Sequence, residues 1–329
     1  MKKRILSLLM TLCVAVCFVP TLAFADETPT QTVNVDVSMA NTENDDYKVM
    51  DNAINLRKDG QVYELTGNTD RKIQIWGSNS PDAVKTFYLR LNNATVNGGI
   101  TIWNSSGAKL VIEVADGTNN TVKRVSAVNL KITGKGTLNA TDLGVTQNSD
   151  SSNPSALYIK DTTIKVNNNG NPSQWNGECV LDGDANITYN NVANYAALAL
   201  GQTTSIKHSL IMKENSKLYC LHSNAATPAE YSVDGLEIHG AIITLQDNAY
   251  LEAQVRDSSG DYLGSAISSD SDIIVEDNAT INANAYGAAI STWGNVKATG
   301  GKIIAKSSRS NGIFADQNIE IKNAEAEVE

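Results

Sequence analysis

The sequence predicts an all-β protein, a parallel β-solenoid of about eleven coils, each of 22–31 residues. Three observations lead to this fold class. Apolar residues alternate with polar ones at a period of two, a C-terminal segment repeats at a fixed period, and a short turn motif recurs along the chain. Helical repeats are disfavoured, because their apolar residues would be spaced by three and four.

The repeat is clearest from residue 265 to the end of the sequence, where three rows align. Each row opens with a small-apolar pair, continues as an alternating strand, turns, and begins another strand. The strand anchors Val275, Ala298 and Ile321 are 23 residues apart, twice. A lone repeat of this size cannot bury its apolar face, so we expect such rows to stack.

The turn motif reads apolar, any residue, then Asn, Asp or Gly, a small residue, any residue and a second apolar residue, and a longer form has one more residue before the second apolar one. Asn, Asp and Gly tolerate the left-handed backbone of a tight bend. We therefore expect a corner at each instance, with the first apolar residue buried between coils. The nine instances begin at Leu91, Ile132, Ile159, Leu181, Met212, Leu245, Val275, Ala298 and Ile321.

The spacing of these anchors predicts where loops leave the solenoid. The first spacing, 41 residues, is expected to hold two coils, and spacings above 23 residues imply loops. The loop candidates, rich in Asn, Ser, Gly or Pro, are Gln147–Pro154, Asn167–Gly177, Asn191–Ser205, Asn224–Ser232 and Arg256–Asp261.

The chain divides into three parts. Residues 1–25 read as a secretory signal peptide, with a basic start, an apolar run and the site Ala23-Phe24-Ala25, so we expect cleavage before Asp26. Residues 26–46 read as a flexible acidic leader, with one candidate strand at Val33–Val37. We expect residues 47–329 to form the solenoid. Because Glu329 falls in mid-repeat, we expect the natural protein to continue beyond it.

Charge limits the partners. The whole chain has 26 basic and 36 acidic residues, and loss of the signal peptide brings the net charge to about −13. Such a chain should repel nucleic acid. After the signal peptide, no stretch is long and apolar enough to span a membrane. We expect a monomer that is secreted, extracellular or held at the cell surface.

Two cysteines remain after cleavage, Cys179 and Cys220, both at inward-facing steps. We expect buried free thiols. Their separation of 41 residues suggests nearly two coils, or roughly 9.6 Å at sheet spacing, which is too far for a disulfide.

Residues 53–140 resemble the carbohydrate-binding β-helix domain of secreted bacterial proteins. The matching segments are INLRKDGQVYELTG, TFYLRLNNATVNGGITIW, AKLVIEVADGTNNTV and NLKITGKGTLNA, of which GTNNT at 117–121 is the most specific. The resemblance implies a right-handed parallel β-helix of the pectate-lyase type. It also implies binding of plant or cell-wall polysaccharides, acidic ones included, often with Ca²⁺. In the later coils this chain lacks the family's acidic Asp-Gly-Ile steps.

Aromatic residues supply the candidate carbohydrate-binding site. Trp76 follows Ile-Gln-Ile and Trp103 follows Ile-Thr-Ile, at the same place in successive coils, with Trp293 at a similar place later. Stacked outward rings would form a strip for a pyranose face, although a ladder that only covers the corner is an equal alternative. Tyr88 and Tyr158, beside Arg90 and Lys160, could hold an acidic sugar; the alternative is a solvated sheet face.

Calcium is the candidate cofactor, since closely spaced turn carboxylates suit a hard cation. The main candidate site is Asp270, Asp272 and Asp277. Other candidates are Asp182 with Asp184, and Asp257 with Asp261.

We expect no enzymatic activity, because no arginine or aspartate cluster matches a lyase or hydrolase signature. His208, His222 and His239 lack metal-ligand spacing and are expected in surface or turn positions. The sequence favours a polysaccharide-binding module. The alternatives are a passive adhesin stalk without a ligand of its own and, less favoured, a polysaccharide lyase.

Overall fold

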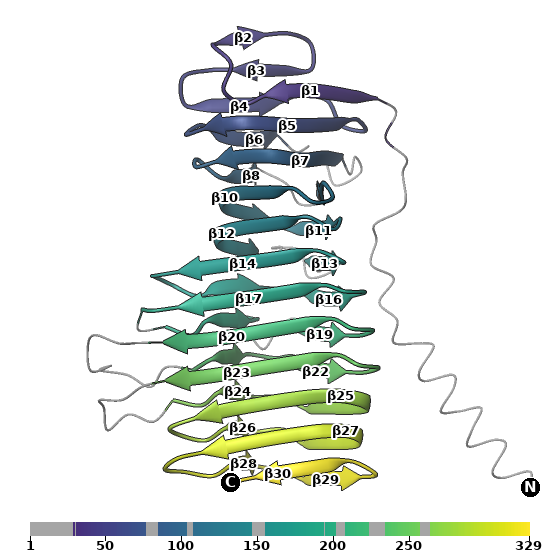
Figure 1. Ribbon diagram of the computed structural model, residues 1–329, viewed down its shortest axis with the longest axis vertical. Coiled ribbons are helices and arrows are strands. Elements are labelled where there is room, and N and C mark those ends of the chain that lie inside the picture. Colours follow the sequence, from purple (N-terminus) through teal and green to yellow (C-terminus); the bar gives the residue numbers. More distant parts are fainter. Residues whose placement is uncertain are drawn as a thin grey trace, which may run out of the picture.

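The protein is all-β, with no helix among the described residues and with mostly parallel strands, as the sequence predicts. The structure, a computed structural model, describes residues 29, 31–76, 85–103, 108–146, 155–193, 195–201, 208–223, 234–256 and 264–329. The strands stack one above another along the long axis (Figure 1). Within the described residues, their pairings form three parallel ladders.

The first ladder begins each turn of the chain. Successive pairing joins β5 (Val62–Thr69), β7 (Thr86–Val96), β9 (Lys109–Val114), β11 (Asn129–Thr133), β13 (Ala156–Lys160), β16 (Glu178–Asp182), β19 (His208–Met212), β22 (Ala241–Leu245), β25 (Ile273–Ala285), β27 (Val296–Ser307) and β29 (Ile319–Lys322).

The second ladder follows the corner motif. It contains the distal parts of β5, β7, β25 and β27, together with β10 (Asn119–Ala127), β12 (Thr137–Val145), β14 (Thr163–Asn168), β17 (Asn186–Asn191), β20 (Lys217–Ser223), β23 (Tyr250–Arg256) and β30 (Glu325–Val328).

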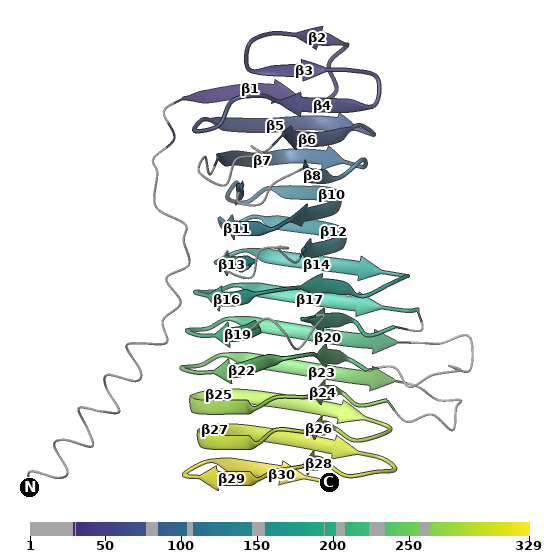
Figure 2. The same cartoon turned by 180° about the vertical axis from the view of Figure 1, so that it is seen from behind.

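The third ladder closes each turn, and its later strands β24, β26 and β28 lie in sequence down the stack when it is seen from behind (Figure 2). It joins the distal parts of β10 and β12 with β4 (Ala53–Leu56), β6 (Lys72–Trp76), β8 (Ile100–Trp103), β15 (Ser173–Trp175), β18 (Leu198–Leu200), β21 (Leu236–Ile238), β24 (Ile267–Ser269), β26 (Ile290–Thr292) and β28 (Ile313–Ala315).

A rung is one passage of the chain through the three ladders, for example β13, β14 and β15. The expected register is confirmed in the repeat, where Val275 pairs with Ala298 and Ala298 with Ile321. The 41-residue spacing also holds two rungs, since β9 lies between the rungs of Leu91 and Ile132. Two loop predictions are wrong in part, because Asn167–Gly177 contains β15 and Asn191–Ser205 contains β18. The other three loop candidates fall wholly or largely outside the described residues.

The corner motif is confirmed at all nine instances. In each, the second residue after the apolar anchor has a positive φ, between 50° and 104°. These residues are Asn93, Gly134, Asp161, Gly183, Glu214, Asp247, Asp277, Gly300 and Asn323. Eight are the residue types that tolerate this backbone, and Glu214 is the exception. The local sterics of the motif therefore produce the bend between the first and second ladders.

Inward side chains form one continuous apolar core. The anchors Leu91, Ile132, Ile159, Leu181 and Val275 are fully buried, as expected. The prediction that Ile321 is buried is wrong. Ile321 lies in register with Ala298 but is 38% exposed, because no described strand pairs with β29 on its other side.

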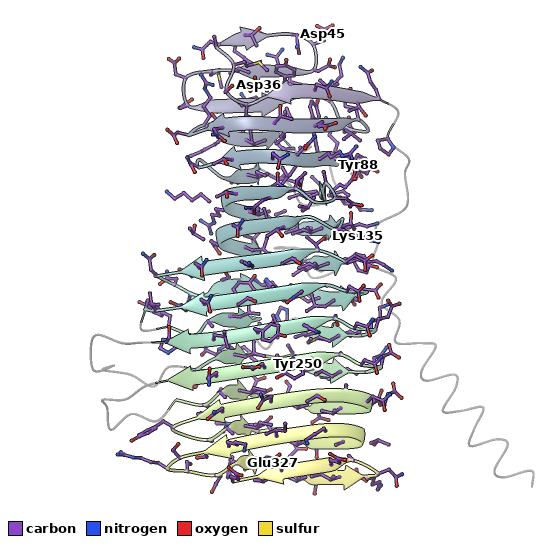
Figure 3. The ribbon with its side chains drawn as sticks, in the orientation of Figure 1. Asp36, Asp45, Tyr88, Lys135, Tyr250 and Glu327 are labelled. Carbon is purple, nitrogen blue, oxygen red and sulfur yellow. The ribbon has the colours of Figure 1, made fainter. Side chains whose placement is uncertain are left out.

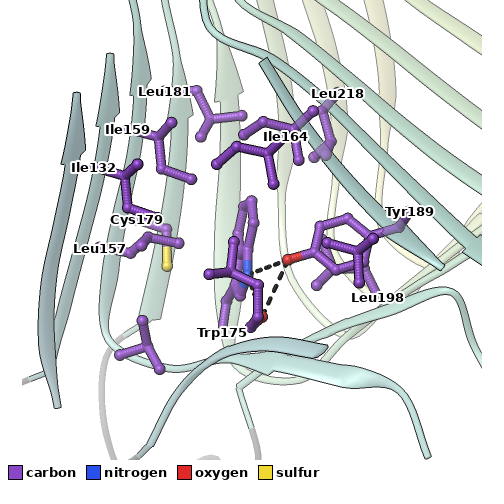
Figure 4. Packing of buried hydrophobic residues seen from close by; sticks show 14 of the residues in the cluster. Ile132, Leu157, Ile159, Ile164, Trp175, Cys179, Leu181, Tyr189, Leu198 and Leu218 are labelled. Carbon is purple, nitrogen blue, oxygen red and sulfur yellow. Dashed lines mark hydrogen bonds between the residues drawn. The ribbon is translucent and has the colours of Figure 1, made fainter. Parts of the chain in front are cut away.

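Two large aromatics fill the core between the ladders (Figure 4). The indole N–H of Trp175 donates to the hydroxyl of Tyr189 at 2.9 Å, and this hydroxyl donates to the Leu143 carbonyl at 3.1 Å. The two rings meet edge to face, with centroids 5.7 Å apart. Their polar atoms are thus satisfied inside the core, as burial of aromatic polar groups requires.

The cysteines are free and buried, as expected. Their expected separation of nearly two coils is wrong. Cys179 in β16 pairs with Leu210 in β19, and β19 belongs to the same rung as β20, which holds Cys220. The two thiols therefore lie in adjacent rungs on different ladders. Burial raises the pKa of both thiols far above the usual value.

The strand expected at Val33–Val37 is confirmed, and a second short strand follows it within the expected acidic leader. β1 (Thr32–Asp36) pairs in parallel with β5, and Val35 and Val37 are fully buried. β2 (Thr42–Glu43), β3 (Tyr47–Val49) and β4 then pair antiparallel, beyond the first rung. Alternating valines in this acidic stretch supply enough apolar surface for β1 to join the stack.

Candidate functional site

The tryptophans predicted to bind carbohydrate lie in register at the end of the third ladder. β6 pairs with β8 so that Trp76 is the partner of Trp103, and the preceding Ile75 is fully buried. The tryptophan side chains are outside the described part of the structure. Trp293 occupies the matching place after β26, where its side chain is 72% exposed. An aromatic residue at this step of a rung can therefore face solvent.

The predicted tyrosines share one outward row of the first ladder. Register places Tyr88, Val111, Lys131 and Tyr158 in four consecutive rungs. The Lys131 ammonium lies 5.8 Å from the centre of the Tyr158 ring, within range of a cation–π contact. Tyr88 and Tyr158 therefore stand about 14 Å apart at sheet spacing.

Arg90 lies on the same face and forms an ion pair with Glu113. Its Nε atom is 3.6 Å from a carboxylate oxygen of Glu113, the residue that pairs with it in the next rung. The same Nε is buried without a hydrogen-bond partner. The structure brings Arg90 and Tyr88 together on one strand, β7, while Tyr158 lies three rungs away.

The centre of this face is the carboxylate of Asp182, which the sequence indicated only as a calcium candidate together with Asp184. The Asp182 side chain is only 5% exposed, and it accepts a 2.5 Å hydrogen bond from the Tyr158 hydroxyl. The ammonium groups of Lys160 and Lys213 lie 3.6 and 3.5 Å from the same oxygen. The signal that could have revealed this cluster is the shared offset of the two lysines and Asp182 from their corner anchors.

Burial alone would raise the pKa of Asp182. The hydrogen bond from Tyr158, the charge of Lys213, the Gly183 N–H and the charge of Lys160 outweigh burial and lower this pKa below its usual value. Burial and the adjacent carboxylate raise the pKa of Tyr158 far above its usual value. Two lysines therefore flank one buried carboxylate and a protonated phenol, and the charges of Asp161 and Glu214 also act on this phenol.

The aspartates proposed for calcium are each used by the fold. Asp270 accepts from the Gly240 N–H at 2.6 Å, and Asp277 accepts from the Asp247 N–H at 3.0 Å. Asp272 accepts from the Asn295 N–H at 2.8 Å and lies 3.0 Å from the Lys297 ammonium. Burial alone would raise the pKa of Asp272, but these contacts outweigh burial and lower this pKa below its usual value.

Among the residues that the structure describes, no group of three or more His, Cys, Asp or Glu side chains is arranged to hold a metal ion. Asp182 and Asp184 diverge, since Asp182 faces the lysines while Asp184 accepts from Asn215 across the corner at 3.1 Å. Asp257 and Asp261 lie outside the described residues. The calcium site stays a prediction.

The expectation for two histidines is wrong. His208 and His222 are 5% and 1% exposed. His208 Nδ1 accepts from the Gly177 N–H at 2.8 Å, and His222 Nε2 lies 2.7 Å from the Ala193 carbonyl. Both therefore serve as internal hydrogen-bonding groups for the backbone. His239 is half exposed, as expected of a turn residue, beside Glu237.

Comparison with known proteins adds no family to this picture. No protein-family model, no curated protein and no solved structure matches the chain. In the described part of the chain, no helix is long and apolar enough to cross a membrane. The fold and surface thus define a class only: an all-β protein of stacked, mostly parallel strands with tyrosine and lysine side chains along one outer face.

Proposed function

We propose that this protein is a secreted polysaccharide-binding module, without catalytic activity, whose three ladders wind as a right-handed parallel β-helix of about eleven coils. Recurrence of parallel pairing from rung to rung supports the winding. The single observation that supports the function is the outward row of Tyr88, Lys131 and Tyr158, together with the lysines around Asp182.

The ligand proposed for this face is an acidic polysaccharide of the pectin type. The chain is strongly acidic overall, with a net charge of −10, yet three lysines, Lys131, Lys160 and Lys213, gather along this face. A sugar carboxylate would be repelled by most of the surface and attracted here. The Tyr158 ring, held by its hydrogen bond to Asp182, offers an apolar face beside these charges.

The spacing of the rungs suggests how a long polysaccharide would lie on the protein. Successive rungs are spaced by about 4.8 Å, similar to the length of one pyranose unit. The third ladder ends, and the first begins, along one edge of the stack, so Trp76, Trp103 and Tyr88 all belong near that edge. A polysaccharide lying along the long axis would meet matched side chains rung after rung.

The test is calorimetric titration with oligogalacturonate. Lys131→Ala combined with Lys160→Ala should weaken binding about tenfold, since two charged contacts of about 0.7 kcal/mol each are lost. Lys165→Ala is the matched control, because Lys165 is an exposed outward lysine of the same rung on the second ladder. It should leave the affinity unchanged.

Three results would contradict the proposal. If the double variant binds as tightly as the parent, the face is a solvated sheet surface. If the parent binds no member of a glycan array that holds acidic and neutral polysaccharides, a passive stalk is the better description. A rise in absorbance at 235 nm with polygalacturonate, which marks lyase cleavage, would overturn the non-catalytic assignment.

A further inference from the structure

A second aromatic surface lies on the second ladder, away from the face described above. Tyr219 in β20 and Tyr250 in β23 project outward from adjacent rungs, with ring centroids 5.7 Å apart and planes inclined by 50°. Register pairs Tyr219 with Glu252 and Lys217 with Tyr250, so the rings meet diagonally. Figure 3 shows Tyr250 on the outer face of the second ladder.

Hydrogen bonds fix one ring of the pair. The Tyr250 hydroxyl donates to Glu252 Oε2 at 2.8 Å and accepts from Asn282 Nδ2 at 3.2 Å. Asn282 follows Glu252 in the next rung, so three consecutive rungs contribute to the surface. A ring held in this way loses little conformational entropy when a ligand packs on it.

Unused polar atoms surround the rings. Glu252 Oε1, Asn282 Oδ1 and the Tyr219 hydroxyl have no hydrogen-bond partner among the described residues. Burial, aided by the charge of Glu252, raises the pKa of Tyr219, so its hydroxyl stays protonated at neutral pH. The surface therefore offers two acceptors and one donor at the rim of a bent aromatic platform.

We propose that Tyr219, Tyr250, Glu252 and Asn282 form a second carbohydrate-binding site, specific for neutral pyranose chains. Flat C–H faces of such sugars pack on aromatic rings, while their hydroxyls donate to carboxylate and amide oxygens. The Glu252 charge disfavours uronic acids at this site. The site shares no residue with the first-ladder face, so the inference does not rest on the function proposed above.

The experiment measures binding of cellohexaose and xylohexaose by calorimetry to the whole protein. Tyr219→Val and Tyr250→Val keep strand propensity while removing the rings. Each should weaken binding about fivefold, and the double variant at least tenfold, on the usual scale of aromatic contacts. Glu252→Gln should weaken binding severalfold, because a neutral amide is a poorer acceptor than a carboxylate.

Matched controls separate the two sites. The double valine variant should bind oligogalacturonate like the parent, and the Lys131→Ala, Lys160→Ala variant should bind cellohexaose like the parent. Circular dichroism checks that each variant is folded. If the valine variants are not folded, loss of affinity in Glu252→Gln is the test, and an unchanged affinity in that variant would overturn the site. Tyr219→Phe and Tyr250→Phe are the conservative controls. These retain both rings and should keep affinity within about threefold.

Three outcomes would overturn this site. The parent could bind neither neutral hexasaccharide, the double valine variant could bind them unchanged, or the lysine variant could lose them as well. In the first two cases Tyr219 and Tyr250 only cover the sheet. In the third the neutral sugar uses the first-ladder face.

Discussion

The hydroxyl of Tyr158 donates a 2.5 Å hydrogen bond to the carboxylate of Asp182, one rung away on the outer face of the first ladder. The two residues are 24 positions apart in sequence. Parallel register brings them together, and Lys160 and Lys213 complete the charge balance. This contact links the stability of the stack to the pH of the solution.

Asp182→Asn should destabilise the protein at pH 7 by about 1–3 kcal/mol, because two ammonium groups lose their carboxylate. The folded pKa of Asp182 is lowered, so its contribution is present above the unfolded pKa, near 3.9, and is lost as pH falls through the folded value. Urea unfolding from pH 7 to pH 2 measures both effects.

Wild-type protein should lose stability below about pH 4, and Asp182→Asn should lose less over the same interval. Asp184→Asn is the control, since Asp184 lies at the exposed corner of the same rung. An unchanged acid dependence in Asp182→Asn would show that other carboxylates govern acid unfolding.

Val275→Asp should cost about 3 kcal/mol or more, because it places an unpaired charge in the core between Leu245 and Ala298. Ile274→Asp, one residue earlier on the half-exposed outer face, should cost far less. Thermal unfolding of the two variants compares them. Equal melting temperatures would mean that β25 is assigned the wrong face.

Glu214→Asn should stabilise the protein by about 1 kcal/mol. Glu214 has a φ of 55°, a left-handed backbone that asparagine adopts more readily than other residues with a Cβ. Glu214→Ala removes the same charge among the acidic corner residues but keeps the strain, so it should give no comparable gain. If both variants are stabilised equally in urea, charge repulsion is the cause and not backbone strain.

Trp76→Ala and Trp103→Ala should each weaken binding of a glycan severalfold, and the double variant by about tenfold or more. The reason is their matched register in β6 and β8, which would place outward rings at the spacing of adjacent rungs. Trp293→Ala, at the matching step far along the stack, tests whether the strip extends. An unaffected double variant would mean that the rings only cover the corner.

Local residue pattern is enough to predict the strand class, the inward and outward sides, and the corners. Alternation assigns side chains to opposite faces of a strand, so burial of Leu91, Ile159 and Val275 follows from local pattern. The left-handed bend likewise depends on residue type, as the positive φ of Asn93 and Asp161 shows. These properties need no knowledge of distant contacts.

Only the tertiary structure shows which rungs are neighbours and which side chains lie side by side on the outer face of each ladder. Rung lengths vary because residues are inserted between strands. Cys179 and Cys220 therefore lie in adjacent rungs although they are 41 residues apart in sequence. The same register joins Tyr158 to Asp182 and Tyr219 to Tyr250, and buries His208 and His222. A contact between rungs depends on the summed length of every turn between two residues, which local sterics and periodicity do not encode.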